Sequence, residues 1–409
     1  MTELVAIPLI LITLGAIVMP GVARTIAMPV AVVEIVYGIA IGRSGLALIP
    51  NAEDPFITFL SEVGFAFFLF LAGLEIDFRS MERAGWKQNT LYGLISVIAF
   101  ALSITIATQL GWGLWVGLAT GATSVPLLLA VVRELRLSAT VVGGTMITVA
   151  AMGEAITILL LSLVEIQQHA HTLGEGLLGL AKLLGLIAAM FATVILLRTL
   201  LWWYPRAFYR MVSEDDPSEV GVRVGFGLMF AFIGLSMLAN VEPFLGAFIA
   251  GAILAYIIRE KGALEHKLSS MGYGFFVPVF FIHVGIRLEN LTPALFIEHG
   301  PWIAGIIGVM LMVKVLPGLL LLRQNLSVPV VLATSGLLAA PLTLVIAIMD
   351  IGMRVHAVDA MTNTVVVTAG IIASLLFPSA ARRLLSDVPP APAPASAGHG
   401  HGHGHGHGH

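Results

Sequence analysis

Hydrophobic runs of about 20 residues recur along most of the chain, separated by short polar or glycine-rich breaks. A helical run of this length crosses the roughly 30 Å hydrocarbon core of a bilayer. The pattern predicts an all-α polytopic membrane protein with thirteen transmembrane helices, each placed to within a few residues. The predicted spans are 4–20, 27–42, 56–74, 89–110, 112–133, 139–163, 177–203, 220–239, 241–259, 272–289, 300–323, 327–352 and 358–380.

The composition agrees with a membrane location. Of the 409 residues, 58% are hydrophobic and 11% are charged, whereas a soluble domain carries about 25% charged residues. The absence of cysteine excludes disulfides and cysteine-based metal or redox chemistry. Residues 4–20 lack a basic leader and an obvious cleavage site, so we interpret them as the first span and not as a signal peptide.

Basic residues predict the orientation of the chain. With thirteen spans, sixteen Lys and Arg residues fall in one set of alternate loops and four fall in the other. Because positive loops remain in the cytoplasm, the N-terminus is expected outside and the C-terminus in the cytoplasm.

The order of the spans predicts an inverted repeat. Six spans precede 177–203 and six follow it, so a single linking helix gives the two halves opposite orientations, as in many secondary transporters. We expect one membrane transporter domain over residues 1–387. Residues 388–409 form a disordered Pro/Ala linker and a His/Gly tail, which could bind divalent metal or be an added purification handle.

One carboxylate lies in the middle of a span. Glu154, in VAAMGEAITILL, is the only charge between Arg136 and Glu165. A charge at the bilayer centre costs about 3 kcal/mol or more, so such a residue usually has a function. A carboxylate can bind either a proton or a cation, and this competition couples the two fluxes. The alternative is a structural carboxylate tied to a neighbouring helix.

A lysine is similarly placed. Lys314, in GVMLMVKVLPGLL, lies nine residues before Arg323, roughly 14 Å along a helix. That depth favours a buried role over an ammonium group that extends to the interface, which is the alternative.

Two spans contain polar and helix-breaking residues at their centres, in segments 117–129 and 333–345. Each combines Gly, Thr and Ser with a mid-span proline, which removes a backbone donor and disturbs a helix. These are the fifth spans of both halves, and interrupted helices at corresponding places indicate a transport site. Oxygens near Thr123 and Ser124 are therefore candidate cation ligands, although each segment alone could be a kinked structural helix.

Other polar residues are weaker candidates. Glu62 and Glu34 could face the bundle or satisfy hydrogen bonds, and Glu75 and Asp77 suit an entry funnel or loop anchor. We interpret His283 as a packed core residue and Glu242 as a capping charge at a helix N-terminus.

The sequence contains no convincing phosphate loop, zinc signature or nucleophile triad. We therefore expect no enzyme activity, no cofactor and no nucleic-acid partner.

Several segments together resemble the second branch of the monovalent cation:proton antiporters, which includes sodium/proton exchangers and potassium-efflux transporters. The resemblance covers residues 5–382. It rests on MPVAVVEIVYGIAIG (28–42), GFAFFLFLAGLEID (64–77), ATSVPLLLAVVREL (122–135), FLGAFIAGAILA (244–255) and FFVPVFFIHVGIRLE (275–289).

The resemblance implies core and dimerisation subdomains interleaved along the chain, a homodimer, and two crossed broken helices at the ion site. The family's essential acidic residue falls on Glu154 and its lysine on Lys314. Where some relatives have Arg and Glu in the second broken helix, this chain has Thr343.

The family usually has Asp-Asp, Asn-Asp or Gln-Asp where this chain has Gly153-Glu154. With one carboxylate remaining, we expect electroneutral exchange and a position for Lys314 close to Glu154.

These observations together predict a secondary antiporter in a bacterial inner membrane that exchanges Na+ or K+ for H+ by an elevator movement and serves pH homeostasis. Glu154, Thr123 and Ser124 are the expected ion and proton ligands, supported by Lys314, Thr343 and Glu62. The alternatives are a proton-uncoupled uniporter or channel-like path, and a non-transporting scaffold or sensor.

Overall fold

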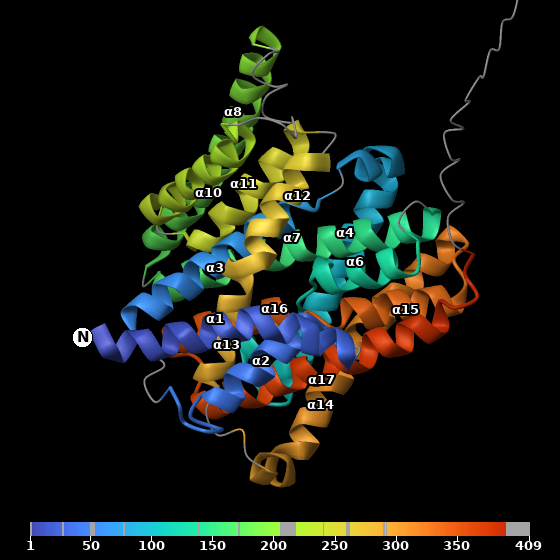
Figure 1. Cartoon of the computed structure of the whole chain (residues 1–409). Helices are drawn as coiled ribbons and strands as arrows, with labels where there is room; N and C mark the ends of the chain where they lie inside the picture. The colour runs from blue at the N-terminus through green and yellow to red at the C-terminus, as the bar shows by residue number, and fades with distance from the viewer. Residues whose placement is uncertain are drawn as a thin grey trace, which may run out of the picture.

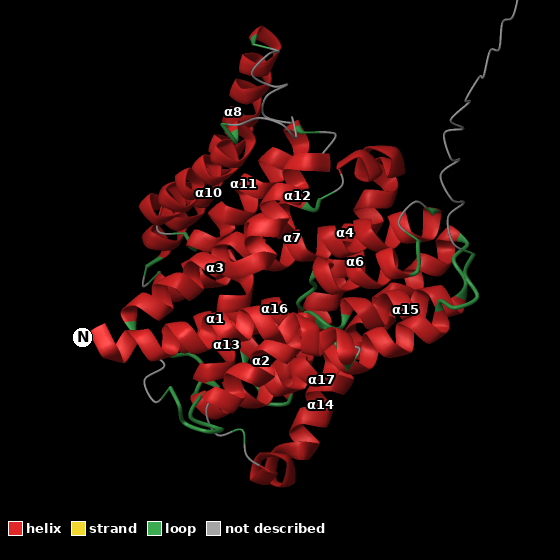
Figure 2. Cartoon of the chain, viewed as in Figure 1, coloured by secondary structure: helices red, strands yellow, loops and turns green. Residues whose placement is uncertain are grey.

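Every regular element among the described residues is helical (Figure 2). The computed structural model describes residues 2–26, 28–49, 54–76, 78–137, 140–170, 172–204, 218–239, 241–258, 262–288, 291 and 293–389. The polar segment 204–219 between two predicted spans and the predicted tail at 388–409 lie almost entirely outside the described residues, and Asp77 also lies outside them. The all-helical prediction is confirmed.

The helices follow the hydrophobic runs of the sequence. Ten helical stretches among the described residues are long and apolar enough to cross a membrane, and Val30–Ile41 and Pro243–Ile257 are shorter apolar helices. The elements of the first half are α1 (Thr2–Thr25), α2 (Val30–Ile41), α3 (Pro55–Leu74), α4 (Phe78–Gln109), α5 (Leu114–Gly121), α6 (Val125–Glu134) and α7 (Val141–His169). After α8 (Leu173–Trp203) come α10 (Val220–Ala239), α11 (Pro243–Ile257), α12 (Gly262–Met271), η1 (Gly272–Phe276), α13 (Val277–Arg287), α14 (Pro293–Gly318), η2 (Leu319–Gln324), α15 (Val328–Leu338), α16 (Leu342–Arg354) and α17 (Ala360–Leu384).

Two helices begin well before the predicted spans. The span predicted from residue 272 continues a helix that starts at Gly262, because α12 passes through the π-helical turn η1 into α13. The span predicted from residue 89 belongs to α4, which starts at Phe78 and bends at Gly85. Gly85 has φ 76°, a conformation that glycine adopts without strain. In both cases the extension is polar, so hydropathy does not reveal it.

The helices form two groups according to which helices they contact. The α3 bundle contains α1, α2, α3, α10, α11, α12, η1 and α13, and the α7 bundle contains α4–α7 and α14–α17 with η2. Between the bundles, α7 contacts α11, and α8 contacts α7, α10 and α11. Figure 1 shows α10 and α11 on one side of the molecule and α4, α6 and α15 on the other.

Close backbone contacts stabilise the α3 bundle. A Cβ on Gly251 of α11 would lie 1.9 Å from the Phe70 carbonyl oxygen of α3, and one on Gly38 of α2 would lie 2.1 Å from the Ile282 carbonyl oxygen of α13. Glycine at such crossings lets helices approach closely inside a membrane. The α3 bundle is therefore built as a tightly packed unit.

Candidate functional site

Two helices are interrupted within the segments that the sequence predicts. α5 ends at Gly121 and α6 begins at Val125, and α15 ends at Leu338 before α16 begins at Leu342. Each break leaves carbonyl groups at one helix end and N–H groups at the next without intrahelical partners. Both breaks lie in the α7 bundle, so they place polar backbone groups in an otherwise apolar interior.

The two interruptions meet through side chains. Ser124 Oγ and Thr343 Oγ1 lie 3.1 Å apart and share a hydrogen bond. Both residues are buried. The structure thus brings together two predicted site residues that are 219 positions apart in sequence.

Glu154 lies at the same crossing. Its residue is 1% exposed, and its Oε2 accepts a hydrogen bond from the Val125 N–H at 3.3 Å. Its Oε1 accepts one from Ser124 Oγ at 3.5 Å, the outer limit for such a bond. The N-terminus of a helix carries a partial positive charge that stabilises an anion. The start of α6 therefore favours a carboxylate at this position.

Lys314 is buried at the opposite side of the first interruption. Its Nζ donates to Thr123 Oγ1 at 2.7 Å and to the Gly121 carbonyl oxygen, and it lies 5.4 Å from the centre of the Phe100 ring. Cations are favoured at helix C-termini, so Lys314 stabilises the end of α5.

The expectation that Lys314 lies close to Glu154 stays a prediction. The ion pairs within the described part of the chain include neither residue. The two charges instead compensate opposite ends of one broken helix, because each is drawn to the helix terminus of opposite partial charge.

Gly153 explains how Thr123 reaches its position. A Cβ on Gly153 would lie 2.9 Å from Thr123 Cβ and 3.0 Å from its Oγ1, so a side chain there would displace Thr123. Thr157 completes this arrangement, because its Oγ1 accepts from the Thr123 N–H at 3.2 Å and donates to the Gly153 carbonyl oxygen at 2.7 Å. Thr157 was missed by the sequence analysis, although its spacing of three residues from Glu154 places both on one helix face.

Substituting Gly153 with alanine is expected to destabilise the protein by about 1–3 kcal/mol, because the new methyl group overpacks the site. Gly144 in the same helix is a matched control, since a Cβ added there would have no atom within 4 Å. Gly144→Ala should be neutral or stabilising because alanine favours a helix interior. Thermal unfolding in detergent measures both variants, and equal melting temperatures would contradict the packing explanation.

A pocket of about 210 Å³ reaches the hydroxyl pair. We call it the Ser124 pocket. Its lining includes Ser124 and Thr343 together with Ala31 of α2, Phe68 of α3 and Phe281 of α13. The pocket therefore lies between the two bundles and connects the polar crossing with their shared boundary.

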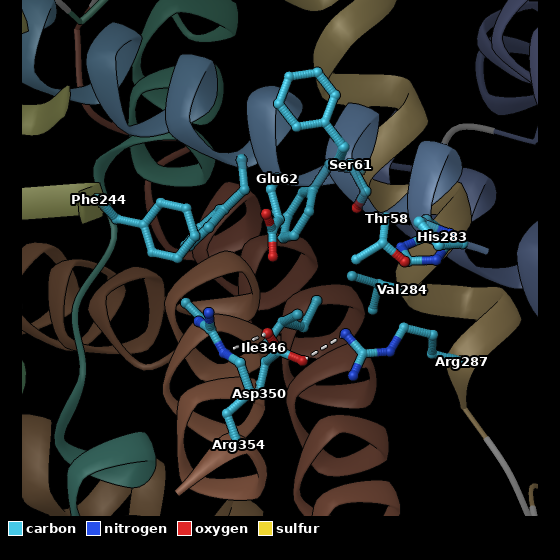
Figure 3. A pocket seen from close by; sticks show the side chains of 15 residues that line it. Thr58, Ser61, Glu62, Phe244, His283, Val284, Arg287, Ile346, Asp350 and Arg354 are labelled. Carbon is cyan, nitrogen blue, oxygen red and sulfur yellow. Dashed lines mark hydrogen bonds and ion pairs between the residues drawn. The ribbon is translucent and has the colours of Figure 1, made fainter. Parts of the chain in front are cut away.

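A larger pocket of about 440 Å³ approaches α16 elsewhere along the same boundary (Figure 3). We call it the Glu62 pocket, because Glu62 of α3 faces it opposite Asp350 of α16 (Figure 3). His283, expected to be a packed core residue, is buried and lines this pocket. Glu62 is thus placed away from the crossing of the interrupted helices, unlike the other predicted site residues.

Aromatic side chains lie between the two pockets. Phe65 and Phe280 line the Glu62 pocket and stack with ring centroids 4.8 Å apart. Phe68 and Phe281 line the Ser124 pocket and meet edge to face at 6.0 Å. Because all four belong to α3 and α13, the tightly packed bundle supplies an apolar barrier between two partly polar spaces.

Glu242 differs from its predicted role. It occupies the N-cap position of α11, but its side chain makes no capping hydrogen bond. Instead it pairs with Arg354 of α16 at 3.6 Å. A tertiary partner from another helix therefore determines its position.

No group of three or more His, Asp or Glu side chains that could hold a metal ion occurs within the described ranges. The oxygens at the crossing come from one carboxylate, hydroxyl groups and the backbone. Such a set can bind a proton or a monovalent cation, since hydroxyl, carbonyl and carboxylate oxygens can replace part of a cation's hydration shell.

Comparison with known proteins agrees with this chemistry. The protein YjbQ of Bacillus subtilis is 28% identical over 380 residues, which cover 88% of this chain and 59% of YjbQ. The Na+/H+-K+ antiporter GerN of Bacillus cereus is 27% identical over 267 residues, covering 64% of this chain and 66% of GerN. The aligned chain thus spans less than two thirds of the length of either relative.

The fold is similar to that of a solved antiporter. The sodium proton antiporter MjNhaP1 from Methanocaldococcus jannaschii superimposes with a TM-score of 0.65 at 15% identity, covering 94% of this chain and 98% of MjNhaP1. Residues 10–386 match the family described as the transmembrane sodium/hydrogen exchanger. Because this match extends over most of the chain, the protein belongs to the transmembrane sodium/hydrogen exchanger family.

Proposed function

We propose that this protein is a secondary antiporter that exchanges Na+ or K+ for H+, with Glu154 as the group that binds either ion. The observation that carries the proposal is a single buried carboxyl group at the crossing of two interrupted helices, beside the hydroxyl groups of Ser124 and Thr343. Burial in apolar surroundings favours the neutral form of a carboxyl group. A proton or a cation can each neutralise the Glu154 carboxylate, so the two compete for one binding site.

The arrangement supports electroneutral exchange. Glu154 offers one negative charge, which one proton or one monovalent cation neutralises. Lys314 is already engaged with Thr123 and the end of α5, so its charge remains a fixed part of the site. One cation then crosses for each proton.

Alternating access would come from movement of the α7 bundle against the α3 bundle, as in an elevator. Both interruptions and Glu154 belong to the α7 bundle, whereas the aromatic barrier belongs to the close-packed α3 bundle. The Ser124 and Glu62 pockets lie along the boundary between them and provide candidate entrances from opposite sides. Two copies joined through their α3 bundles would hold that bundle still.

The membrane arrangement completes the proposal. Thirteen spans would form two inverted repeats with the interrupted helices as the fifth span of each half. The distribution of basic residues supports an outer N-terminus and a cytoplasmic C-terminus in a bacterial inner membrane. GerN is named for both sodium and potassium, which supports testing both cations here.

Purified protein in proteoliposomes tests the function directly. With an imposed pH gradient, adding Na+ or K+ should dissipate the gradient, and Li+ completes the series. The rate of sodium-driven dissipation should be unchanged by valinomycin with equal K+ on both sides, because electroneutral exchange is insensitive to membrane potential.

Two results would contradict this proposal. Cation flux that needs no counter-movement of protons would identify a uniporter or channel-like path. Acceleration by valinomycin would show that net charge moves and that the stoichiometry is not one to one.

A further inference from the structure

A third hydroxyl group lines the Ser124 pocket, besides the pair at the crossing of the interrupted helices. It belongs to Ser374 of α17, which lines this pocket together with Ser124 and Thr343. Ser374 is 1% exposed, and its Oγ has no hydrogen-bond partner among the described residues. The buried part of the pocket therefore contains an unpaired polar group.

Other hydroxyl groups of α17 are paired within the helix. Serine and threonine side chains inside a helix can donate to the carbonyl oxygen four residues earlier, as Thr364 and Ser379 do. A buried polar group without a partner is costly, and in a native protein it calls for an explanation. A ligand that enters the Ser124 pocket would supply the missing interaction for Ser374.

The pocket leads from an exposed mouth to the buried hydroxyl groups. Val30, Ala130 and Tyr273 line it and are exposed, whereas the three hydroxyl-bearing residues are buried. None of the described residues that line the pocket carries a charge, and below the mouth the three hydroxyl groups are its polar side chains. A cation that loses water inside the pocket therefore depends on these hydroxyl groups for side-chain oxygens until it reaches Glu154.

The three hydroxyl groups and Glu154 belong to the same bundle. Ser374 lies on α17, Thr343 on α16 and Ser124 in the break between α5 and α6, all within the α7 bundle. Ser124 Oγ lies 3.5 Å from Glu154 Oε1, so this wall of the pocket extends to the carboxyl group. A cation held against the wall would keep the same ligands while the α7 bundle moved past the α3 bundle.

We propose that Ser374 is a cation ligand in the Ser124 pocket and helps to set the affinity for Na+ or K+. The proposal rests on the proposed function, because it makes this pocket the route by which the exchanged cation reaches Glu154. Together with Ser124 and Thr343, Ser374 provides a third hydroxyl oxygen that replaces part of the hydration shell of the cation.

Transport by Ser374→Ala in proteoliposomes tests the proposal. The alanine variant offers the cation one oxygen fewer. The Na+ or K+ concentration that gives half of the maximal rate should therefore rise by about threefold or more, while the maximal rate stays near that of the parent. Ser374→Thr retains a hydroxyl group and should have a half-maximal concentration close to that of the parent.

Thr368→Val is the matched control. Thr368 lies on the same helix, is 4% exposed, and its Oγ1 also lacks a hydrogen-bond partner within the described part of the chain. It does not line the Ser124 pocket. Valine removes the hydroxyl group and keeps the shape of the side chain, so the half-maximal concentration should equal that of the parent. The same rise in both variants would show that Ser374 acts through helix packing and would overturn the proposal.

Thermal unfolding in detergent measures cation binding without transport. Replacing choline chloride with NaCl or KCl at constant ionic strength should raise the melting temperature of the parent, because a ligand that binds the folded state stabilises it. Ser374→Ala should show a smaller rise. In choline chloride it should unfold at the same or a higher temperature than the parent, because alanine removes an unpaired buried group. A purely structural role predicts a lower melting temperature in every salt.

A second variant covers the case in which Ser374→Ala is not monodisperse on size exclusion. Ser374→Cys has nearly the same size and replaces the oxygen with sulfur, a softer atom that suits these cations poorly. It should show the same higher half-maximal concentration and the same smaller cation-dependent rise in melting temperature.

The outcome is distinguishable from failure of the proposed function. If Ser374→Ala keeps the half-maximal concentration and the cation-dependent stabilisation of the parent, the role of Ser374 is wrong and the antiporter function stands. If the parent dissipates no pH gradient, but its stabilisation by cation is reduced in Ser374→Ala, the proposed function fails and the cation ligand remains.

Discussion

Glu154→Gln is expected to reduce cation-driven dissipation of a pH gradient to the rate of protein-free liposomes. Glutamine has nearly the same shape, and its carbonyl oxygen can still accept from Val125 N–H and Ser124. It cannot bind and release a proton, and it brings no negative charge to a cation. Exchange should therefore stop while the fold is retained, and a melting temperature near that of the parent would verify folding.

Two further variants sharpen this result. Glu154→Asp keeps a carboxylate but shortens it by one methylene, so exchange should continue with a changed cation affinity. Glu62→Gln makes the same chemical change in the Glu62 pocket, away from the crossing. This variant should still exchange cations for protons, but it should need a higher cation concentration to reach half of its maximal rate. Parent-rate exchange by Glu154→Gln would show that another group carries the ions.

Local sequence patterns predicted the site residues that are unusual within their own helix, such as a charge or a helix-breaking residue in an apolar segment. Glu154 and Lys314 were identified because a charge in an apolar run is expensive, and both are buried. The two interruptions were identified because Gly, Thr, Ser and Pro weaken a helix. These features need no knowledge of which helices are neighbours.

Relations between distant segments could not be predicted in the same way. The hydrogen bond between Ser124 and Thr343 depends on how α6 and α16 cross. Glu242 was expected to cap its own helix, but its side chain makes no capping hydrogen bond and pairs with Arg354 of α16. A sequence pattern reports local propensity, whereas these partners are fixed by tertiary packing.

Gly153 shows why one substitution in a motif can be hard to interpret from sequence. The resemblance places it where the family usually has Asp, Asn or Gln, and from the sequence alone this indicated only that one carboxylate remains. In three dimensions its missing side chain makes room for Thr123, whose hydroxyl then accepts a hydrogen bond from Lys314. The glycine therefore makes the contact between Thr123 and Lys314 possible and is not simply a lost side chain.

Lys314→Met is expected to destabilise the protein by about 2–5 kcal/mol, because the Gly121 carbonyl and the Thr123 hydroxyl both lose a buried donor. Methionine is also unbranched and flexible, so it fills much of the same space. Lys314→Arg is the matched control, since it keeps the positive charge at the end of α5 and should lose less stability. Thermal unfolding in detergent, with and without added cation, measures the three proteins.

The same variants separate a fixed charge from a proton carrier. If Lys314 only stabilises the broken helix, Lys314→Met should exchange more slowly but remain as insensitive to valinomycin as the parent. If the parent responds to valinomycin and Lys314→Met does not, Lys314 binds and releases a proton during each cycle. Glu154 would then share proton transfer with Lys314. Removal of the Lys314 ammonium group can change the net charge moved per cycle only if that group gains and loses a proton during transport.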